Sequence, residues 1–335
     1  MREPRFWSGN IDPRSREAAP LLRFLLTPLA WIYAEATRRK IASATPLKVR
    51  PKVICVGNLT VGGVGKSPVV AALRAYFKKT TSYRVASLSR GYKGNLKGPL
   101  RVDPDAHSAD DVGDEPLMLA ALGETWIGAD RAATGQVMSN EAVDVIVMDD
   151  GHQNPGLHKD LSIIVVDAET GFGNGYVIPK GPLREPIAAG LARADAVIVV
   201  GGGRLPLQLN DCPVPVFRAK IAPVHTPEPK PYVAFAGIGR PEKFFDTLTG
   251  LNVDLRDAVP FPDHHKFSSG DLDYLRRLAQ DYGATLITTE KDFVRLTPEQ
   301  RVGIETLPIM VQFDREADLD KMLANVIKPQ ADGKV

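Results

Sequence analysis

Cysteine is scarce in this sequence: the 335 residues include only two, Cys55 and Cys212. Two cysteines cannot form the disulfide framework of a small secreted domain, and their scarcity is typical of a protein from a reducing compartment. The six histidines and two cysteines also lack the CxxC and HExxH spacings of common zinc sites, so we expect no zinc centre of those types. Cys55 lies in a short apolar run, where a small core residue is the simplest interpretation.

Long hydrophobic runs are missing as well. A helix needs about 20 apolar residues to cross a bilayer, and the apolar stretch 24–34 is shorter and is interrupted by Thr27 and Pro28. A cleavable signal peptide is not expected, because this stretch begins more than twenty residues into the chain and has charges on both sides. With 44% apolar and 24% charged residues, the chain is predicted to be globular, with one large or two ordinary domains.

Net charge is low, at +2, but it is unevenly distributed. Residues 1–52 carry eleven Lys and Arg against four Asp and Glu, a local excess of +7. This excess suggests a polyanionic surface near the N-terminus, either a membrane or a nucleic acid. Trp31 and Tyr33 favour membrane interfaces, and the basic cluster 38–40 suits anionic headgroups.

We therefore predict that residues 1–45 form an amphipathic segment that lies on a membrane surface. The alternative is an amphipathic helix that packs on the protein's own core. No nucleic-acid partner and no obligate protein partner are expected.

From residue 52 onward, apolar runs alternate with helical patterns, as a parallel sheet with crossover helices requires. Runs such as 143–148 and 162–166 are rich in Val and Ile, which is typical of strands buried on both faces. We predict an α/β fold with a mostly parallel sheet and flanking helices. The predicted strands are 53–57, 83–88, 124–128, 143–148, 161–167 and 195–200, and the predicted helices include 67–79, 114–122 and 130–140.

Prolines become frequent around residues 203–230, and the stretch H-T-P-E-P-K-P is typical of a linker. We place this linker at 219–230, between a first α/β domain over 46–218 and a second, smaller α/β domain over 231–312. A closing helix over 317–327 would pack on either domain. The smaller domain is predicted to contain strands near 232–236, 284–288 and 308–312 and helices near 241–249 and 269–281.

The chain is organised around residues 53–70, V-I-C-V-G-N-L-T-V-G-G-V-G-K-S-P-V-V. A strand, a glycine-rich loop and a helix follow in order, and the amides of such a loop bind phosphate oxygens. Lys66 would reach the β- and γ-phosphates of a nucleotide, and the Ser67 hydroxyl would bind Mg²⁺. Thr60 stands where the usual motif has its first glycine, and the two glycines that follow it supply flexibility instead. The alternative is an ordinary glycine-rich turn.

Two pairs of carboxylates are candidates for chemistry near this loop. Asp149 and Asp150 end a buried strand, as the acidic residues of a Walker B element do, at the edge of a parallel sheet where metal ions and phosphates gather. A turn or a helix cap is the alternative. Asp114 and Glu115 stand in V-G-D-E-P at a helix start, where they either cap the helix or supply the base that takes a hydroxyl proton.

Other charged residues follow the same pattern. His264 stands in F-P-D-H-H-K-F, where it is an oriented base, a metal ligand or part of a surface turn. Arg90, Arg131 and Arg184 lie just beyond strands or in the loops between them. Any of the three would bind a phosphate, although each alone is most simply a surface charge.

Taken together, these motifs resemble the tetraacyldisaccharide 4′-kinases, the membrane-associated lipid A kinases of Gram-negative bacteria. The family's loop also has threonine at the position of Thr60. Small departures are Ser67 for the more usual threonine, His152 where phenylalanine is common, and Lys93 after the S-R-G-Y motif. The resemblance runs nearly end to end, through G-N-L-T-V-G-G-V-G-K-S-P, S-R-G-Y, V-G-D-E-P, D-D-G-H-Q, G-P-L-R-E-P, A-G-I-G-R-P, D-H-H and T-T-E-K-D.

The resemblance implies a kinase at the cytoplasmic face of the inner membrane that uses ATP and Mg²⁺ to phosphorylate the 4′-hydroxyl of an acylated glucosamine disaccharide 1-phosphate. It also implies that the first domain, 46–218, is a P-loop kinase domain, that a cleft separates it from the smaller domain, and that the chain's end, 313–335, packs back on the first. It assigns catalysis to Lys66 and to the general base Asp114, which His264 orients. The implied nucleotide-binding residues are Thr60, Gly62, Gly63, Val64, Gly65, Lys66, Ser67 and Arg184, and the implied metal-binding or orienting residues are Ser67, Glu115, Asp149, Asp150 and Gln153.

The residues themselves, without the resemblance, indicate a P-loop protein that uses Mg²⁺ and ATP and has a basic, membrane-prone N-terminus. The rival interpretation is a P-loop NTPase that acts as a membrane-associated switch or assembly factor. A switch would need a water-positioning residue and no cleft for a second substrate. The second domain with its Asp-His pair therefore favours a transferase.

Overall fold

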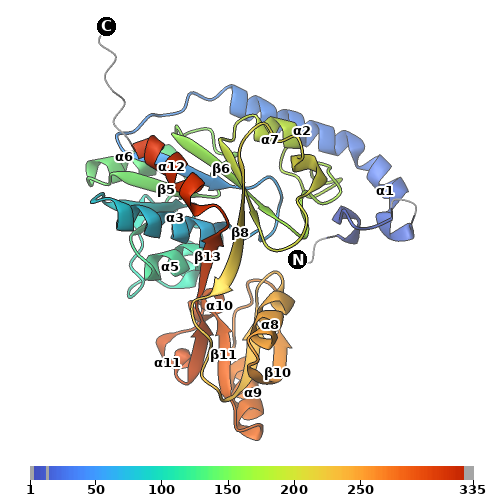
Figure 1. Ribbon diagram of the computed structural model, residues 1–335, viewed down its shortest axis with the longest axis vertical. Helices are drawn as coiled ribbons and strands as arrows, with labels where there is room; N and C mark the ends of the chain where they lie inside the picture. Colours follow the sequence, from blue (N-terminus) through green and yellow to red (C-terminus); the bar gives the residue numbers. More distant parts are fainter. Residues whose placement is uncertain (1–3, 13–14, 328–335) are drawn as a thin grey trace.

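The computed structural model describes residues 4–12 and 15–327. The predicted segments 1–45 and 313–335 extend beyond the described residues. Their parts 1–3, 13–14 and 328–335 lie outside what the structure describes. The chain forms a larger part built on a nine-stranded sheet and a smaller part built on a four-stranded sheet (Figure 1). The predicted α/β class with a mostly parallel sheet is thereby confirmed.

The larger sheet is parallel except at its two edges, where each edge strand runs antiparallel to its neighbour. Its inner strands are buried along most of their length, as their Val- and Ile-rich sequences predict. In spatial order the strands are β13 (Ile309–Phe313), β8 (Val216–Pro223), β7 (Ala196–Val200), β6 (Leu161–Asp167), β1 (Lys52–Gly57), β5 (Val145–Asp149), β2 (Val85–Ser89), β4 (Thr125–Ile127) and β3 (Leu100–Arg101).

β1 is the central strand of this sheet. It pairs with β5 on one side, where Val53 lies opposite Ile146, and with β6 on the other, where Cys55 lies opposite Ser162. The chain first builds the β5 side of β1 and then crosses to the β6 side. Ligands bind parallel sheets at the carboxyl ends of strands where the strand order reverses. The ends of β1, β5 and β6 are therefore the expected position of a site.

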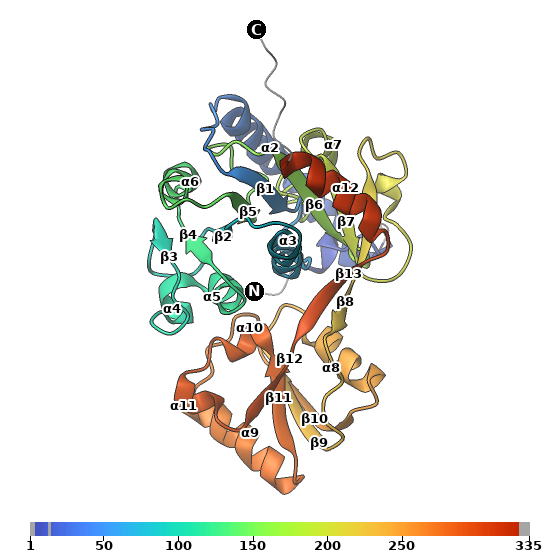
Figure 2. The ribbon, with the colours of Figure 1, turned by 60° about the vertical axis from the view of Figure 1, so that its left-hand side comes forward.

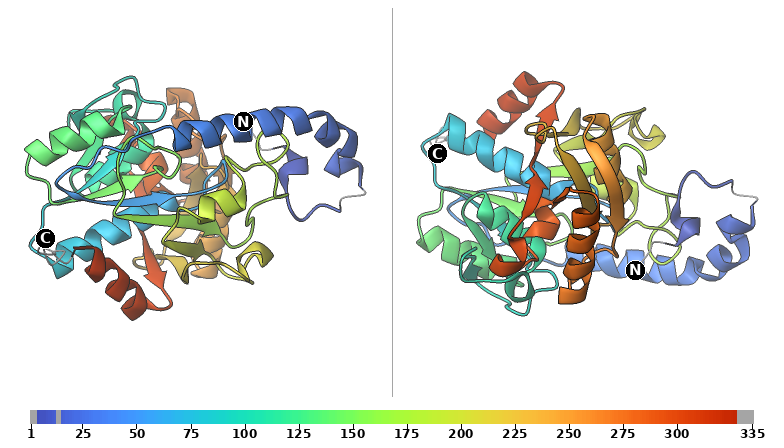
Figure 3. Two further views of the ribbon diagram at one scale, coloured as in Figure 1. Left: turned by 90° about the horizontal axis from the view of Figure 1, so that it is seen from above. Right: turned by 90° about the horizontal axis from the view of Figure 1, so that it is seen from below.

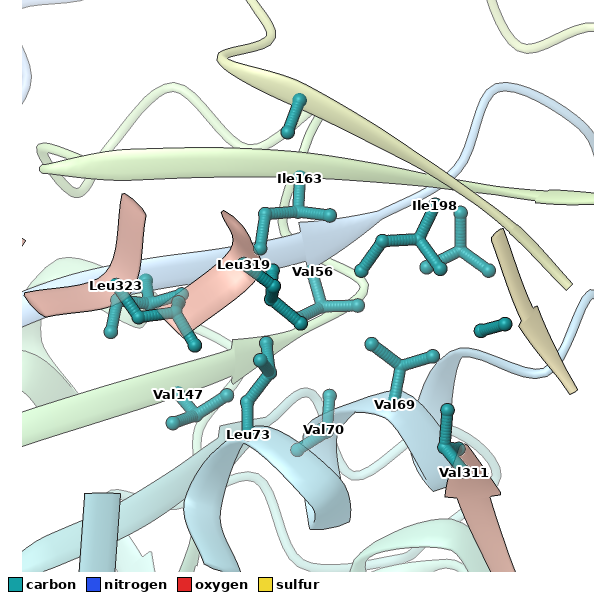
Figure 4. Packing of buried hydrophobic residues seen from close by; sticks show 14 of the residues in the cluster. Val56, Val69, Val70, Leu73, Val147, Ile163, Ile198, Val311, Leu319 and Leu323 are labelled. Atoms are coloured by element: carbon teal, nitrogen blue, oxygen red, sulfur yellow. The ribbon is translucent and has the colours of Figure 1, made fainter. Parts of the chain in front are cut away.

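The helices of the larger part cover both faces of its sheet (Figure 2). α3 and α12 share one core with the sheet, in which Leu73, Phe77, Leu319 and Leu323 are buried. Figure 4 shows Leu319 and Leu323 of α12 beside Leu73 of α3 and Val56 of β1. The closing helix thus packs on the larger part. The helices are α3 (Lys66–Thr80), α4 (Ala109–Val112), α5 (Asp114–Ala121), α6 (Arg131–Asn140), α7 (Ile187–Leu191) and α12 (Glu316–Ile327), with a 3-10 turn, η3 (Leu207–Leu209).

The smaller sheet is parallel throughout. Helix boundaries here follow local signals: Ser268 and Asp271 form a capping box at the start of one helix, and Thr297 and Gln300 form another. The strands are, in spatial order, β10 (Asp254–Pro260), β9 (Pro231–Ala236), β11 (Thr285–Thr289) and β12 (Ile304–Leu307), and the helices are α8 (Pro241–Gly250), α9 (Ser269–Asp281), α10 (Glu290–Phe293) and α11 (Pro298–Arg301).

Two predicted segments occupy different places from those expected. The predicted linker 219–230 contains the second half of β8, and the predicted strand 308–312 corresponds to β13, which pairs with β8 in the larger sheet and not in the smaller one. The linker was predicted because prolines are frequent here. However, Pro215 precedes β8 and Pro223 lies at the end of its pairing with β13, so neither proline removes a hydrogen bond from the interior of the sheet. The exact domain boundaries stay a prediction.

The N-terminal residues form two 3-10 turns, η1 (Arg5–Trp7) and η2 (Arg16–Ala18), and two helices, α1 (Pro20–Leu25) and α2 (Thr27–Ala42). These helices run along one side of the larger part and beyond its edge (Figure 3). Ala30 is the one residue of α2 that is buried, whereas Phe24 is 74% and Trp31 69% exposed. The alternative of a helix packed on the protein's own core is therefore wrong for these side chains. Across residues 4–12 and 15–327, no helix has the length and apolarity needed to traverse a bilayer.

Candidate active site

The loop between β1 and α3 has the backbone shape of a phosphate loop. Gly62 and Gly65 have φ angles of 97° and 86°, in the left-handed region that glycine adopts without strain. Gly65 directly precedes α3, and no described side chain caps the helix there. The first amides of α3 have no intrahelical acceptor, so they are available to phosphate oxygens. Val64 is buried and anchors the loop in the core, while Gly63 lies in open space.

A second segment, the loop before α7, supports the first half of this loop. Thr60 forms an antiparallel bridge with Leu183, and the Val61 amide donates to the Pro182 carbonyl over 2.9 Å. The Arg184 amide donates to the Leu59 carbonyl over 2.7 Å. The G-P-L-R-E-P motif is thus a structural partner of the phosphate loop and also brings the Arg184 side chain to it.

Lys66 and Arg184 converge on one carboxylate, that of Asp150. The Lys66 Nζ lies 3.5 Å from Asp150 Oδ1, and the Arg184 Nη1 donates to the same oxygen over 2.7 Å. Burial would raise the pKa of Asp150, but the charges of Lys66 and Arg184 hold it below its usual value. Asp150 has φ 52°, a strained angle for a residue with a side chain, and such strain is common at functional sites.

Asp149, the neighbouring carboxylate, has the opposite environment. It is 1% exposed; its Oδ2 accepts a hydrogen bond of 3.3 Å from the Ser67 hydroxyl, and its Oδ1 is buried without a partner. Burial, with the negative charge of Glu115, raises the pKa of Asp149 to about 7. A buried carboxylate oxygen without a donor, beside a hydroxyl, fits a cation ligand, and Mg²⁺ prefers such oxygens. No cluster of three His, Cys, Asp or Glu side chains suited to a metal occurs among the residues described.

Gln153 is held in a network and not directed at Asp149. Its Nε2 donates to the Asn58 carbonyl and to Glu185 Oε1, each over 2.9 Å, and its Oε1 accepts from Arg184 over 3.4 Å. Glu185 is 2% exposed and also accepts two hydrogen bonds of 2.8 Å from Arg193. Gln153 therefore orients Arg184 and the end of β1. Glu185 was not among the predicted site residues, although it directly follows Arg184.

The smaller part faces this site with the residues that follow its parallel strands. His264, after β10, donates through Nδ1 to Asp114 Oδ2 over 2.8 Å, and Arg295 Nε donates to the same oxygen over 3.0 Å. Burial would raise the pKa of Asp114, but the His264 hydrogen bond and the charges of Lys291 and Arg295 hold it far below its usual value. His264 has φ 61°, a second strained residue at the site. The predicted pair of Asp114 and His264 is thus in direct contact.

Glu115 contacts the smaller part through its carboxylate. Its Oε1 lies 3.2 Å from the Lys291 Nζ, and Lys291 lies 3.9 Å from Asp114. Lys291 belongs to the T-T-E-K-D motif, whose role the sequence left open. Asp292 of the same motif is buried and accepts from the Gly237 amide, which fixes the loop that carries His264.

A second contact between the two parts was not predicted. Asp167, which ends β6, accepts from Arg240 Nη2 over 2.6 Å and from Lys243 Nζ over 2.9 Å. Arg240 also lies 3.4 Å from the Gly63 carbonyl in the phosphate loop. Burial would raise the pKa of Asp167, but these two cations lower it to about 2. The available signal was the same one that identified Asp149: a carboxylate at the end of a buried parallel strand.

The remaining candidates occupy different places. Arg131 is 3% exposed, donates to the Gly128 carbonyl, and has an Nε without a partner. His152 is buried, and its ring nitrogens lie 3.0 Å from the Ser162 hydroxyl and the Gly190 carbonyl. Burial lowers the pKa of His152 to about 3, so the ring is neutral. This residue, which replaces the family's usual phenylalanine, packs beneath the site as a structural group.

The fold and the site together define a class, the P-loop phosphotransferases, because the phosphate loop faces an ionised carboxylate and an imidazole held by a second part of the chain. The family model described as tetraacyldisaccharide-1-P 4′-kinase matches residues 22–328. The chain belongs to this family, which confirms the resemblance seen in its motifs.

Individual proteins support the assignment. The chain is 52% identical over 328 residues to the tetraacyldisaccharide 4′-kinase of Hyphomonas neptunium, covering 98% of both chains. It is 48% identical to that of Maricaulis maris, covering 99% of this chain and 98% of the relative. Its fold matches the crystal structure of LpxK from Aquifex aeolicus in complex with ATP, with a TM-score of 0.74 and 27% identity, over 91% of this chain and 99% of that one.

The environment of Asp149 generates a prediction about stability. Asp149→Asn should raise the melting temperature of the nucleotide-free protein, because an amide is cheaper to bury than an unpaired carboxylate. A gain of 1 kcal/mol corresponds to roughly 2–4 °C for a protein of this size. The same variant should lose the stabilisation that Mg²⁺ with ATP gives to the wild type.

The matched control is Asp150→Asn, which removes two ion pairs and should lower the melting temperature. Differential scanning calorimetry with and without Mg²⁺ and ATP measures both effects. A fall in melting temperature for both variants would show that the Asp149 carboxylate stabilises the fold, which contradicts its assignment as a cation ligand.

Proposed function

We propose that this chain transfers the γ-phosphoryl group of ATP to the 4′-hydroxyl of a tetraacyldisaccharide 1-phosphate, in lipid A biosynthesis. The observation that carries the proposal is the contact between Asp114 and His264 in front of the phosphate loop. A nucleotide-hydrolysing switch has no need of such a pair from a second part of the chain. Family membership and the relatives' names support the same activity.

The phosphate loop binds and positions the nucleotide. The amides of residues 62–67 surround the phosphates, and Lys66 turns from Asp150 toward the transferred group, whose charge it neutralises. Arg184, oriented by Gln153, supplies a second positive charge. Mg²⁺, held by Ser67 and Asp149 with Asp150, Glu115 or Gln153 as further candidates, would neutralise charge on the phosphates.

Asp114 is the proposed general base. Its low pKa keeps it ionised at neutral pH, so it accepts the hydroxyl proton as the new bond to phosphorus forms. A phosphoryl-transfer transition state is loose and needs little proton removal, so a weak base suffices. His264 and Arg295 fix the direction of the carboxylate, which makes them positioning residues.

The N-terminal segment is proposed to bring the enzyme to the cytoplasmic face of the inner membrane, where an acylated acceptor lies. Its exposed apolar side chains, among them Phe24 and Trp31, suit the boundary between headgroups and acyl chains. The basic residues 38–40 at the end of α2 suit anionic headgroups. Arg38 and Arg39 also pair with Glu35, so Lys40 is the cation of this cluster without a described ion pair.

Acceptor dependence tests the proposed activity directly. ATP consumption by the purified protein should rise strongly when tetraacyldisaccharide 1-phosphate is added, and the product should carry a new phosphate on the 4′-position. Consumption that is equally fast without acceptor would favour the nucleotide-hydrolysing switch instead. Phosphate release and product mass spectrometry measure the two arms.

The Asp114–His264 contact predicts coupled effects. Asp114→Ala and His264→Ala should each lower kcat by about two orders of magnitude or more, with little change in nucleotide affinity. The double variant should lose much less than the product of the two, because groups that act as one unit cannot be lost twice. The measurement is a double-mutant cycle on kcat.

His265→Ala is the matched control, since His265 contacts Asp271 within the smaller part and not Asp114. Multiplicative losses in the cycle would rule out a functional pair. Loss of nucleotide binding in Asp114→Ala would assign this carboxylate to metal binding instead.

The basic cluster predicts salt-sensitive membrane binding. Wild-type protein should bind anionic vesicles and be partly released by high salt. Added salt reduces the distance over which charges attract each other to about 10 Å or less. Arg39→Glu with Lys40→Glu should weaken this binding by roughly thirtyfold, since each basic residue near the surface contributes about 1 kcal/mol. Lys78→Glu with Lys79→Glu, the same charge change at the exposed end of α3, is the control. Equal effects of the two pairs would contradict a membrane-facing N-terminus.

A further inference from the structure

A cavity of about 240 Å³ lies between the N-terminal segment and the loop that follows β6. Its polar lining comes from three segments. Ser8 and Arg23 belong to the N-terminal segment, Asn174 to the loop after β6, and Gln208 to η3. None of its lining residues belongs to the phosphate loop or to the Asp114–His264 contact. The cavity is thus distinct from the catalytic site. Most of its lining residues belong to the N-terminal segment that is proposed to lie on the membrane.

Arg23 is the only charged side chain that lines this cavity, and it is incompletely paired. Its Nε is buried and has no hydrogen-bond partner, and within residues 4–12 and 15–327 no carboxylate forms a salt bridge with it. Its guanidinium lies 5.0 Å from the centre of the Tyr176 ring. A buried donor without an acceptor is costly, and arginine's planar group is the one that best matches a phosphate.

A second cation shares the same aromatic ring. The Lys180 Nζ lies 4.0 Å from the centre of the Tyr176 ring and donates to the Thr27 hydroxyl over 3.0 Å. Lys180 likewise has no carboxylate partner in the part of the chain that the structure describes. Two cations drawn to one ring repel each other. An anion beside them would relieve that repulsion and satisfy the free donor of Arg23.

The apolar neighbours of Arg23 indicate which kind of molecule would bear the anion. Arg23 lies in α1 among Leu22, Phe24 and Leu25, which are 45%, 74% and 62% exposed. A phosphate next to such side chains is expected at a lipid interface, where apolar residues enter the acyl region and basic residues meet headgroups. A free inorganic ion would gain nothing from the apolar neighbours.

We propose that the cavity beside Arg23, together with Lys180 and Tyr176, binds the phosphate group of a lipid. This proposal deepens the membrane placement in the proposed function and rests on it. The phosphate belongs either to a bilayer lipid or to the acceptor's own 1-phosphate; both are phosphate esters on acylated molecules. Lys180 is four residues from Arg184 in the loop that supports the phosphate loop, so occupancy of this site would be linked to the catalytic site through one short segment.

The test compares vesicles of phosphatidylcholine that contain phosphatidic acid with vesicles that contain oleic acid at the same surface charge. Wild-type protein should bind the phosphate-bearing vesicles more tightly, and Arg23→Gln and Lys180→Gln should each reduce that preference by roughly tenfold. Lys40→Gln, an equal charge change at the end of α2, should weaken binding to both vesicles alike and leave the preference unchanged. This arm needs no kinase activity, so it remains informative even if the proposed reaction is wrong.

A second arm separates the two sources of phosphate. In detergent micelles without phospholipid, a roughly tenfold rise in the KM for the acceptor in Arg23→Gln, with kcat and the KM for ATP unchanged, would assign the site to the acceptor's 1-phosphate. An unchanged KM with a lost vesicle preference would assign it to a bilayer lipid. If neither the KM nor the vesicle preference changes in both Arg23→Gln and Lys180→Gln, the site does not bind lipid phosphate.

Discussion

The Asp114 carboxylate is the point at which two separate sheets are held in one arrangement. It belongs to the larger part, whereas His264, Lys291 and Arg295, which surround it, belong to the smaller part. A carboxylate buried this deeply persists as an anion only because several donors compensate its burial. Asp167 of the larger part is likewise held by two cations of the smaller part, Arg240 and Lys243. At these ion pairs the larger part contributes the anions and the smaller part the cations, so the phosphates of a nucleotide add negative charge where the smaller part is positive.

Asp149 and Asp150 show how one sequence motif gives two different groups. Both end the same buried strand, but the chain turns at Asp150 through a left-handed angle. That turn directs Asp150 to Lys66 and Arg184, which keep it ionised. Asp149 stays in the strand, beneath Ser67, and has no cation near enough to offset its burial. Divergent environments of this kind separate the roles of paired carboxylates. Here Asp150 is the partner of two cations, and Asp149 is the proposed ligand of a metal.

The sequence predicted most elements whose local pattern is strong. The phosphate loop, the strands of the larger sheet and the Asp114–His264 pair were identified because each has a periodic or motif signal, and the pair required the family resemblance as well. β8 and β13 were assigned to other units because prolines flank β8 and both strands are largely exposed, so neither has the continuous buried run that marks the inner strands. Arg295 was missed because an isolated charge acquires meaning only when folding brings a partner to it. Arg240 and Glu185 lie in quoted motifs, but their partners are distant in the sequence or are charged neighbours that the motif does not single out. Asp167 carried a usable signal, its position at a strand end.

The loop from Tyr176 to Arg184 connects the phosphate loop to the N-terminal helices. At one end, Tyr176 and Lys180 contact Arg23 and Thr27 of the N-terminal helices. At the other end, Leu183 pairs with Thr60 and Arg184 reaches Asp150. An enzyme that acts on a lipid must hold its phosphate-binding loop at a fixed depth from the bilayer. In the proposed membrane-bound state, a short segment bonded at both ends to these two regions would set that depth by its length, without a separate domain for membrane attachment.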